Sequence, residues 1–140
     1  KAPFLVCEKE ASSQKKRKQP DFRHESVKIM KTIYFTVGEP YKSLILQGKK
    51  TVEGRLCKEK FSELQVGDFL QFQDTGECLE IIALTHYPSF KAMLENEGLK
   101  HTLPGITEID RGREVYCQFY TPEEEKTFGV LAISIRLKTT

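Results

Sequence analysis

The sequence predicts an α+β fold, in which a small, mostly antiparallel β-sheet or barrel carries short helices inserted between its strands. Five segments have the β-branched, aromatic or continuously apolar composition of strands. Between them lie glycine-containing turns and helical patterns with recognisable caps. With 140 residues, 39% of them hydrophobic, the chain can build one core. We therefore expect one domain and no second one.

The first strand, the first helix and the second strand are predicted before residue 58. Residues 32–37 (Thr-Ile-Tyr-Phe-Thr-Val) have the composition of a strand. A short helix with an apolar stripe follows and ends at Gly48. Residues 50–57 form the next strand. Because side chains alternate along a strand, Glu53 and Arg55 should point to the same face.

Two further strands are predicted in the middle of the chain, joined by a tight turn. A turn at Gly67-Asp68 leads into a strand over residues 69–73. A second turn, over residues 74–77, returns the chain into a long strand over residues 78–87. Together these two strands predict an antiparallel hairpin.

Three helices and a last strand are predicted after residue 88. Ser89 caps a helix that ends at Gly98, and residues 107–120 are compatible with another helix. Thr121 is the N-cap of a third, which has proline and three acids in its first turn. Residues 130–137 are the most hydrophobic strand, which we expect to be central in the sheet.

The composition excludes several classes of protein. The chain has no Cys-x-x-Cys pair and no histidine at metal-ligand spacing, so neither a metal site nor a cofactor is expected. No apolar run approaches the roughly 20 residues that cross a bilayer, so no membrane association is expected. The widely spaced cysteines are expected to be reduced thiols, as in a nuclear or cytoplasmic protein. They are Cys7, Cys57, Cys78 and Cys117.

Residues 1–30 are predicted to be a flexible basic arm or linker, and residues 31–140 the folded domain. The arm holds eight Lys/Arg against four Asp/Glu and lacks a sustained apolar period, whereas the domain holds 14 against 16. Charge alone therefore does not indicate nucleic-acid binding by the domain. Because the chain begins with lysine, we expect a processed product or an excised domain.

A basic cluster within the arm consists of Lys15, Lys16, Arg17 and Lys18. Such a cluster indicates either a nuclear import signal or an arm that grips phosphates. A solvated run of charges is an equally weighted alternative.

A charged segment after the first helix carries the strongest functional signal. Its motif is Gly48-x-Lys50-x-x-Glu53-x-Arg55. The other two motifs are the Gly67-Asp68 turn and Tyr116-x-x-Phe119-Tyr120, which leads into Glu123-Glu124-Glu125-x-x-x-Gly129-Val130. In this order the motifs resemble the ASCH domain family over about residues 31–138. The resemblance implies a barrel similar to the pseudouridine-synthase (PUA) barrel, with a cleft for RNA or a nucleoside beside the charged segment.

The residue types of this segment suit an anionic ligand. Lys50 and its neighbour Lys49 supply ammonium groups, Glu53 a carboxylate, and Arg55 a planar fork that matches phosphate or carboxylate. The alternative is a surface ion pair worth about 0–1 kcal/mol. Spacing alone favours that alternative, and the family resemblance favours a ligand-binding cleft.

Aromatic residues give a second indication of nucleic-acid binding. Tyr116, Tyr120 and Tyr41 are candidates to stack on a base, as readers of single-stranded RNA require. Phe119 is expected to be buried in the core.

The resemblance also implies a catalytic alternative. Some bacterial members of the family are amidohydrolases that remove the acetyl group of N4-acetylcytidine with a lysine, a threonine and a glutamate. Lys50 stands at the position of that lysine, but the threonine position holds Glu53. Thr51 is adjacent, yet neighbouring strand residues point to opposite faces. Glu97 and Glu108 are the candidates for the third residue by order.

Three functions stay open at this point. The favoured one is a non-catalytic RNA-binding module that acts with a larger assembly in transcription or RNA processing, because the expected threonine is absent. A hydrolase acting on RNA or a modified nucleoside would use Lys50 and Glu53 as catalytic residues, with His86 and His101 as spare general acids. The third is a protein-interaction domain with a vestigial cleft.

Overall fold

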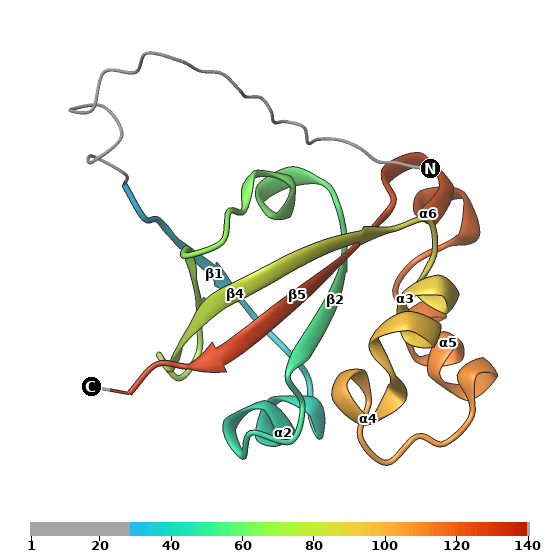
Figure 1. Cartoon of the computed structure of the whole chain (residues 1–140), viewed down its shortest axis with the longest axis horizontal. Coiled ribbons are helices and arrows are strands. Elements are labelled where there is room, and N and C mark those ends of the chain that lie inside the picture. The colour runs from blue at the N-terminus through green and yellow to red at the C-terminus, as the bar shows by residue number, and fades with distance from the viewer. Residues whose placement is uncertain (1–28, 140) are drawn as a thin grey trace.

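The structure is a computed structural model that describes residues 29–139 (Figure 1). The predicted arm, with its basic cluster at residues 15–18, lies outside the described residues apart from its last two. Within residues 29–139, no helix is long and apolar enough to span a bilayer. The same residues contain no group of three or more His, Cys, Asp or Glu that would hold a metal ion. The cysteines in this part of the chain, Cys57, Cys78 and Cys117, are free thiols.

Five strands and five α-helices make up the described fold. In chain order the elements are β1 (Thr32–Phe35), α2 (Tyr41–Leu46), β2 (Val52–Leu56), the 3-10 helix η2 (Glu59–Glu63), β3 (Phe69–Phe72), β4 (Cys78–Tyr87), α3 (Phe90–Glu97), α4 (Leu99–Thr102), α5 (Ile109–Cys117), α6 (Pro122–Phe128) and β5 (Val130–Leu137). All five predicted strands and all four predicted helices are present. The short α4 and η2 were not predicted, because four or five residues are too few to show a period.

The strands form one mixed sheet in the order β1-β3-β4-β5-β2. β1 pairs with β3 in parallel, whereas β3, β4, β5 and β2 pair antiparallel with their neighbours. The prediction of a mostly antiparallel sheet is wrong, because the parallel pair of β1 and β3 makes the sheet mixed. Turn residues predict hairpins such as β3–β4, but β1 and β3 meet only after a crossover through α2, β2 and η2, which leaves no local signal.

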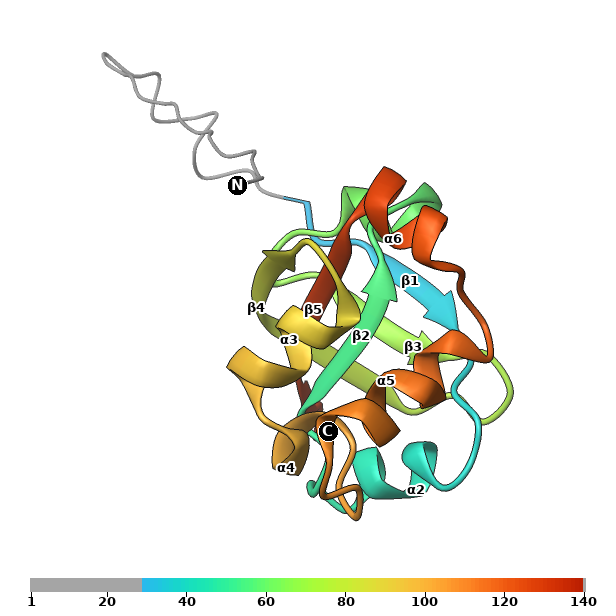
Figure 2. The ribbon, with the colours of Figure 1, turned by 90° about the vertical axis from the view of Figure 1, so that its right-hand side faces the viewer.

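The sheet curls into a half-barrel (Figures 1 and 2). β4 and β5 are its long members, and their register shifts between Ile81 and Ala83, the kind of irregularity that bends a strand pair. β5 lies between β4 and β2, so it is an interior strand but not the middle one. The curl lets the two faces of the sheet bury two separate groups of side chains.

Strand β2 lies between these two hydrophobic cores. One core fills the curl of the sheet and includes Phe35 and Phe72, whose rings stack with centroids 4.9 Å apart. The other lies between β2, β5 and the helices α3, α4 and α5, which gather on one side of β2 (Figure 1). Four of the five residues of β2 are buried as a result. The charged residues of this edge strand are therefore held inside the protein.

The helices begin and end at the residues that the sequence indicates. The Ser89 hydroxyl accepts a hydrogen bond from the Ala92 N–H at 3.0 Å and starts α3, which ends at Gly98 with φ 93°. Thr121 and Glu124 form a reciprocal capping box at the start of α6. Gly112 stands inside α5 because a Cβ there would lie 2.9 to 3.3 Å from three leucine side chains. Close helix packing thus explains a glycine that is unfavourable for a helix by itself.

Asp68, in the turn before β3, ties the start of the domain to the sheet. Its carboxylate accepts hydrogen bonds from the Lys31 N–H at 3.1 Å, from Lys31 Nζ at 2.7 Å and from the Gln65 N–H at 2.8 Å. The residue is 1% exposed. Burial alone would raise the pKa of this carboxyl, but the hydrogen bonds from Lys31 and Gln65 hold it below its ordinary value.

Replacing Asp68 with alanine is expected to lower the free energy of unfolding by about 1.5–3 kcal/mol, because two backbone N–H groups and an ammonium lose a charged acceptor. Chemical denaturation at neutral pH measures this loss. Asp74 is the matched control, since its carboxylate is exposed and pairs with Lys42 at 3.0 Å on the surface. An Asp68→Ala variant as stable as Asp74→Ala would contradict this role.

Candidate functional site

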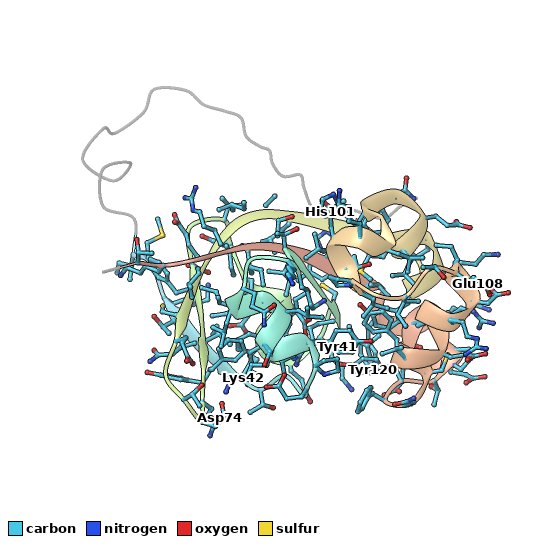
Figure 3. All side chains as sticks on the ribbon, turned by 90° about the horizontal axis from the view of Figure 1, so that it is seen from below. Tyr41, Lys42, Asp74, His101, Glu108 and Tyr120 are labelled. Carbon is cyan, nitrogen blue, oxygen red and sulfur yellow. The ribbon has the colours of Figure 1, made fainter. Side chains whose placement is uncertain are left out.

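A cleft of about 300 Å³ opens where β2, α2 and the end of α5 meet. Its lining combines charged residues in and just before β2 with aromatic residues of α2, of α5 and of the turn that follows α5. The lining residues are Thr36, Gly38, Tyr41, Lys50, Glu53, Gly54, Arg55, Leu103, Val115, Tyr116, Phe119 and Tyr120. Tyr41 and Tyr120 come from far apart in the sequence and lie close together at this point (Figure 3).

Three charged side chains form a buried network along one wall of the cleft. Glu53 Oε1 lies 3.3 Å from Lys50 Nζ, and Glu53 Oε2 lies 2.7 Å from Arg55 Nε. Lys50 is 2% exposed and Glu53 7% exposed. With Lys50 protonated, two cations and one carboxylate give the network a formal charge of +1 beside the cleft. A buried excess charge of this kind favours a negatively charged partner.

Lys50 anchors the network to the surrounding backbone. Its ammonium donates to the Val52 carbonyl at 2.7 Å, to the Thr102 carbonyl and toward Glu53. An ammonium has three N–H donors, so all of them are engaged. Burial lowers the pKa of Lys50, and the neighbouring carboxylate of Glu53 opposes that change. Lys50 therefore joins β2 to the end of α4 and keeps Glu53 in place.

Glu53 is held as a carboxylate despite its burial. Burial alone raises the pKa of this group, but Arg55 and Lys50 outweigh it and hold the pKa below its ordinary value. An ionised Glu53 only accepts hydrogen bonds. It suits a ligand N–H or O–H and would repel an anion that approached it directly.

Arg55 is the cation of the network that has donors to spare. Its Nε donates to Glu53 and its Nη2 to the Thr36 carbonyl at 2.6 Å, and the guanidinium lies 5.4 Å and 5.0 Å from the ring centroids of Phe35 and Phe61. Burial lowers the pKa of Arg55, but Glu53 outweighs it, so the net shift is upward. A guanidinium has five N–H groups. Those left over have no partner among residues 29–139 and are available to a ligand in the cleft.

Aromatic rings form another part of the lining. The ring of Phe90 stacks on Tyr116, with centroids 4.2 Å apart, and on Tyr120, with centroids 5.3 Å apart. Tyr41 faces the network from α2, and Lys50 Nζ lies 5.7 Å from its ring centroid. The tyrosines that line the cleft are thus fixed by packing and need little ordering to receive a flat ligand.

The prediction that Phe119 is buried is wrong, because the ring is 71% exposed. Helix α5 ends at Cys117, and Tyr116 is the last residue on its inward face. Phe119 follows the helix end, where the helical period that places inward residues no longer applies. Its ring borders the mouth of the cleft and contacts Tyr120 at 6.4 Å between centroids.

Tyr116 has an unusual hydroxyl. Its oxygen is the buried side-chain polar atom that finds no hydrogen-bond partner within residues 29–139. Burial raises the pKa of this phenol well above its ordinary value, so it stays protonated. The site contains a buried donor that residues 29–139 leave unsatisfied, an arrangement that is rare in folded proteins.

Replacing Tyr116 with phenylalanine is expected to leave the thermal midpoint unchanged or slightly raised, because an unsatisfied buried hydroxyl carries a desolvation penalty of about 1–3 kcal/mol. Tyr87→Phe is the control, since the Tyr87 hydroxyl donates to Glu97 at 2.5 Å and that variant should be less stable. Thermal unfolding followed by circular dichroism compares the two. A clear loss of stability in Tyr116→Phe would show that the hydroxyl has a partner.

Several other candidate residues do not line the cleft. Lys49 is exposed on the surface, and Thr51 Oγ1 lies 3.4 Å from His101 Nδ1 outside the cleft. Glu97 binds Tyr87, and Glu108 is exposed; Figure 3 places Glu108 and His101 away from Tyr41 and Tyr120. His86 Nε2 lies 3.6 Å from the Cys57 thiol, and His101 lies beside Thr51. Neither histidine lines the cleft, so neither is positioned there as a general acid.

The site also uses groups that the sequence did not indicate. The carbonyls of Thr36 and Thr102 hold Arg55 and Lys50. Every residue carries a carbonyl, so no sequence signal could have identified them. Gly54 was visible in the motif, and a Cβ there would lie 2.8 Å from the Met93 side chain and 3.3 Å from the Tyr116 hydroxyl.

Comparison with known proteins identifies the family. A model of the ASCH domain matches residues 35–139. The crystal structure of hypothetical protein PH0355 is similar, with 41% identity, a TM-score of 0.74 and coverage of 78% of this chain and 100% of that one. The solution structure of protein PF0455 from Pyrococcus furiosus is similar too, with 38% identity, a TM-score of 0.64 and coverage of 77% and 96%.

No functionally curated protein matches the chain. Its structural neighbours therefore give the fold and the family but no named activity. The match to the domain model covers most of the described residues, from the end of β1 to the last described residue after β5. The chain belongs to the ASCH domain family, and this membership supports a domain of a generic RNA-binding type.

Proposed function

We propose that this domain binds RNA, or a nucleoside unit of it, in the cleft formed by the Lys50–Glu53–Arg55 network and the facing tyrosines, and that its half-barrel is of the PUA-like kind. The observation that carries the proposal is the Arg55 guanidinium in the lining of the cleft, which keeps N–H groups that no residue among 29–139 accepts. The three members act differently. Lys50 keeps Glu53 in place, Glu53 accepts a hydrogen bond from the ligand, and Arg55 contacts the anionic group of the ligand.

The charge favours a phosphate group as part of the ligand. A planar guanidinium with free N–H groups binds phosphate through paired hydrogen bonds. The cleft is partly closed to solvent, so the attraction is screened less than it would be on an open surface. The affinity should therefore fall as the salt concentration rises, but only with a shallow slope, because few charges contact the ligand.

The aromatic wall and the size of the cleft favour a base as the other part. A volume of about 300 Å³ is at the lower end of the range for small-ligand sites, which suits one nucleoside unit rather than a folded RNA element. Tyr41 and Tyr120 line the cleft and offer ring faces or edges to that unit. Glu53 would accept a hydrogen bond from a base N–H or a sugar hydroxyl.

The predicted basic arm and a larger assembly belong to the same proposal. The arm would add phosphate contacts along the strand, and the domain would deliver RNA to a transcription or RNA-processing assembly in the nucleus or the cytoplasm. Removing residues 1–30 is then expected to weaken RNA binding and to reduce its dependence on salt.

Fluorescence anisotropy with a labelled single-stranded RNA octamer of random sequence tests the proposal. The intact chain is titrated at several salt concentrations, with an equally long uncharged peptide nucleic acid as the control ligand. We expect saturable binding of the RNA that weakens with salt, and little binding of the uncharged ligand. An RNA affinity no higher than that of the uncharged ligand would refute RNA binding.

A second candidate, hydrolysis of RNA or of a modified nucleoside such as N4-acetylcytidine, is favoured by one observation. Burial lowers the pKa of Lys50, which is the direction that a general base requires. Against it, the three N–H groups of Lys50 are engaged and Thr51 lies outside the cleft. Incubating the protein with N4-acetylcytidine and with short RNA tests this candidate, and no product from either substrate would remove it.

A further inference from the structure

Four aromatic rings form a continuous row from the interior to the surface. Tyr116 stacks on Phe90, Phe90 stacks on Tyr120, and Tyr120 contacts Phe119. Along this row Phe90 and Tyr116 are buried, Tyr120 is partly exposed and Phe119 is 71% exposed. The row ends at the exposed Phe119, which also lines the cleft.

Phe119 is held in this position by the backbone. Its N–H donates to the Tyr116 carbonyl at 2.9 Å, and the Tyr120 N–H donates to the same carbonyl at 3.0 Å. The adjacent helix α6 begins at a capping box. The ring is therefore presented from a fixed turn between two helices and stays 71% exposed beside Tyr120.

We propose that the ligand is a strand of at least two nucleotides, in which one unit enters the cleft and the base of the adjacent unit stacks on Phe119. This inference rests on the proposed function and goes beyond it, because it excludes a free nucleoside as the natural ligand. It makes Phe119 a residue that selects for a strand, outside the part of the cleft that holds the first unit.

Charge supports a strand over a free nucleoside. A free nucleoside has no charge and would leave the +1 of the buried network uncompensated. A phosphodiester carries one negative charge, which matches the network, and it links the sugars of two adjacent nucleosides. Arg55 and Phe119 both line the cleft, and in this proposal the linking phosphate binds at Arg55 while the next base lies at Phe119.

Shape supports the same ligand. The cleft has room for about one nucleoside unit, so a second base must lie outside it. An exposed phenylalanine at that point offers a flat apolar face, and base–aromatic stacking contributes about 1–3 kcal/mol per base. Stacking of this kind tolerates any base, so we expect Phe119 to add affinity without adding sequence preference.

The test compares two probes on the intact chain and its variants: the random RNA octamer and the four ribonucleoside 5′-monophosphates. Phe119→Ala is expected to weaken octamer binding about tenfold, within the range for one stacked base, and to change monophosphate binding less than twofold. Phe119→Trp should restore octamer binding. Phe128→Ala is the matched control, because Phe128 is also exposed but lies outside the cleft, beneath Lys58.

Each outcome decides the inference. It is overturned if Phe119→Ala binds the octamer as wild type does, if it weakens both probes equally, or if wild type binds monophosphates as tightly as the octamer. In those cases, retained binding of either probe leaves the proposed RNA function intact. If wild type binds neither probe, both the function and the inference fail.

Discussion

Replacing Glu53 with glutamine is expected to lower the free energy of unfolding by about 3–5 kcal/mol, the range for breaking a buried ion pair. Glutamine has nearly the same shape, so the loss reports charge rather than volume. Without the carboxylate, the buried ammonium of Lys50 and the guanidinium of Arg55 face each other uncompensated. Urea denaturation at pH 7 measures the change.

Glu95→Gln is the control for this substitution, because Glu95 is an exposed residue of α3 and should change stability by less than about 0.5 kcal/mol. A Glu53→Gln variant that unfolds at the same urea concentration as the control would contradict the buried network.

The same carboxylate predicts how stability depends on pH. The pKa of Glu53 is lower in the folded protein than in the unfolded chain, where it is about 4.3. Its contribution is therefore fully present above about pH 4.3 and is lost as the pH falls through the folded value. Asp68 adds to the acid sensitivity in the same direction. The Glu53→Gln variant should show a shallower fall of stability between neutral and acidic pH than wild type does.

Replacing Arg55 with alanine is expected to weaken binding of the RNA octamer at least thirtyfold, which corresponds to about 2 kcal/mol and is typical of removing a charged contact in a partly closed site. The side chain supplies the only spare cationic donors of the network within the described residues. Anisotropy titrations at one fixed salt concentration measure the loss.

Arg55→Lys separates geometry from charge. Lysine keeps the positive charge but lacks the planar fork, so we expect it to recover only part of the affinity. Arg136→Ala is the surface control, because Arg136 pairs with Glu80 on an exposed part of the sheet. Equal losses in Arg55→Ala and Arg136→Ala would mean that RNA binds through general surface charge.

Local features of the sequence predicted much of the fold. The turn residues at 74–77 and the cap at Ser89 bound β4 on both sides, and β4 runs over Cys78–Tyr87 as predicted. Strand alternation correctly placed Glu53 and Arg55 on one face, where they form an ion pair. These predictions rest on interactions within a few residues, which is why one sequence suffices for them.

Local features of the sequence did not predict contacts between residues that lie far apart in the chain. The parallel pairing of β1 with β3 and the hydrogen bond from Lys50 to the Thr102 carbonyl join parts of the chain that have no shared local pattern. The spacing of the charged residues favours a surface ion pair, so it underestimates their burial. In the structure, β2 is covered by a core on each side. Phe119 was wrongly predicted to be buried, because phenylalanine is usually a core residue.

The structure assigns different roles to neighbouring charges of one motif. Lys50 is committed to backbone carbonyls, Glu53 is committed to two cations, and Arg55 keeps donors for a partner. The residue types of this motif suggest a catalytic group. In the structure, Lys50 and Glu53 instead hold Arg55, which is left to contact a ligand. This arrangement favours recognition over hydrolysis.

The salt dependence of RNA binding by wild type and Arg55→Ala tests this account most directly. If Arg55 contacts one phosphate, the slope of log K against log salt should be smaller in the variant by about 0.7, the value for one phosphate of a single strand. Its affinity should also be lower at every salt concentration. Identical slopes and affinities for the two proteins would contradict the claim that this cleft binds RNA through Arg55.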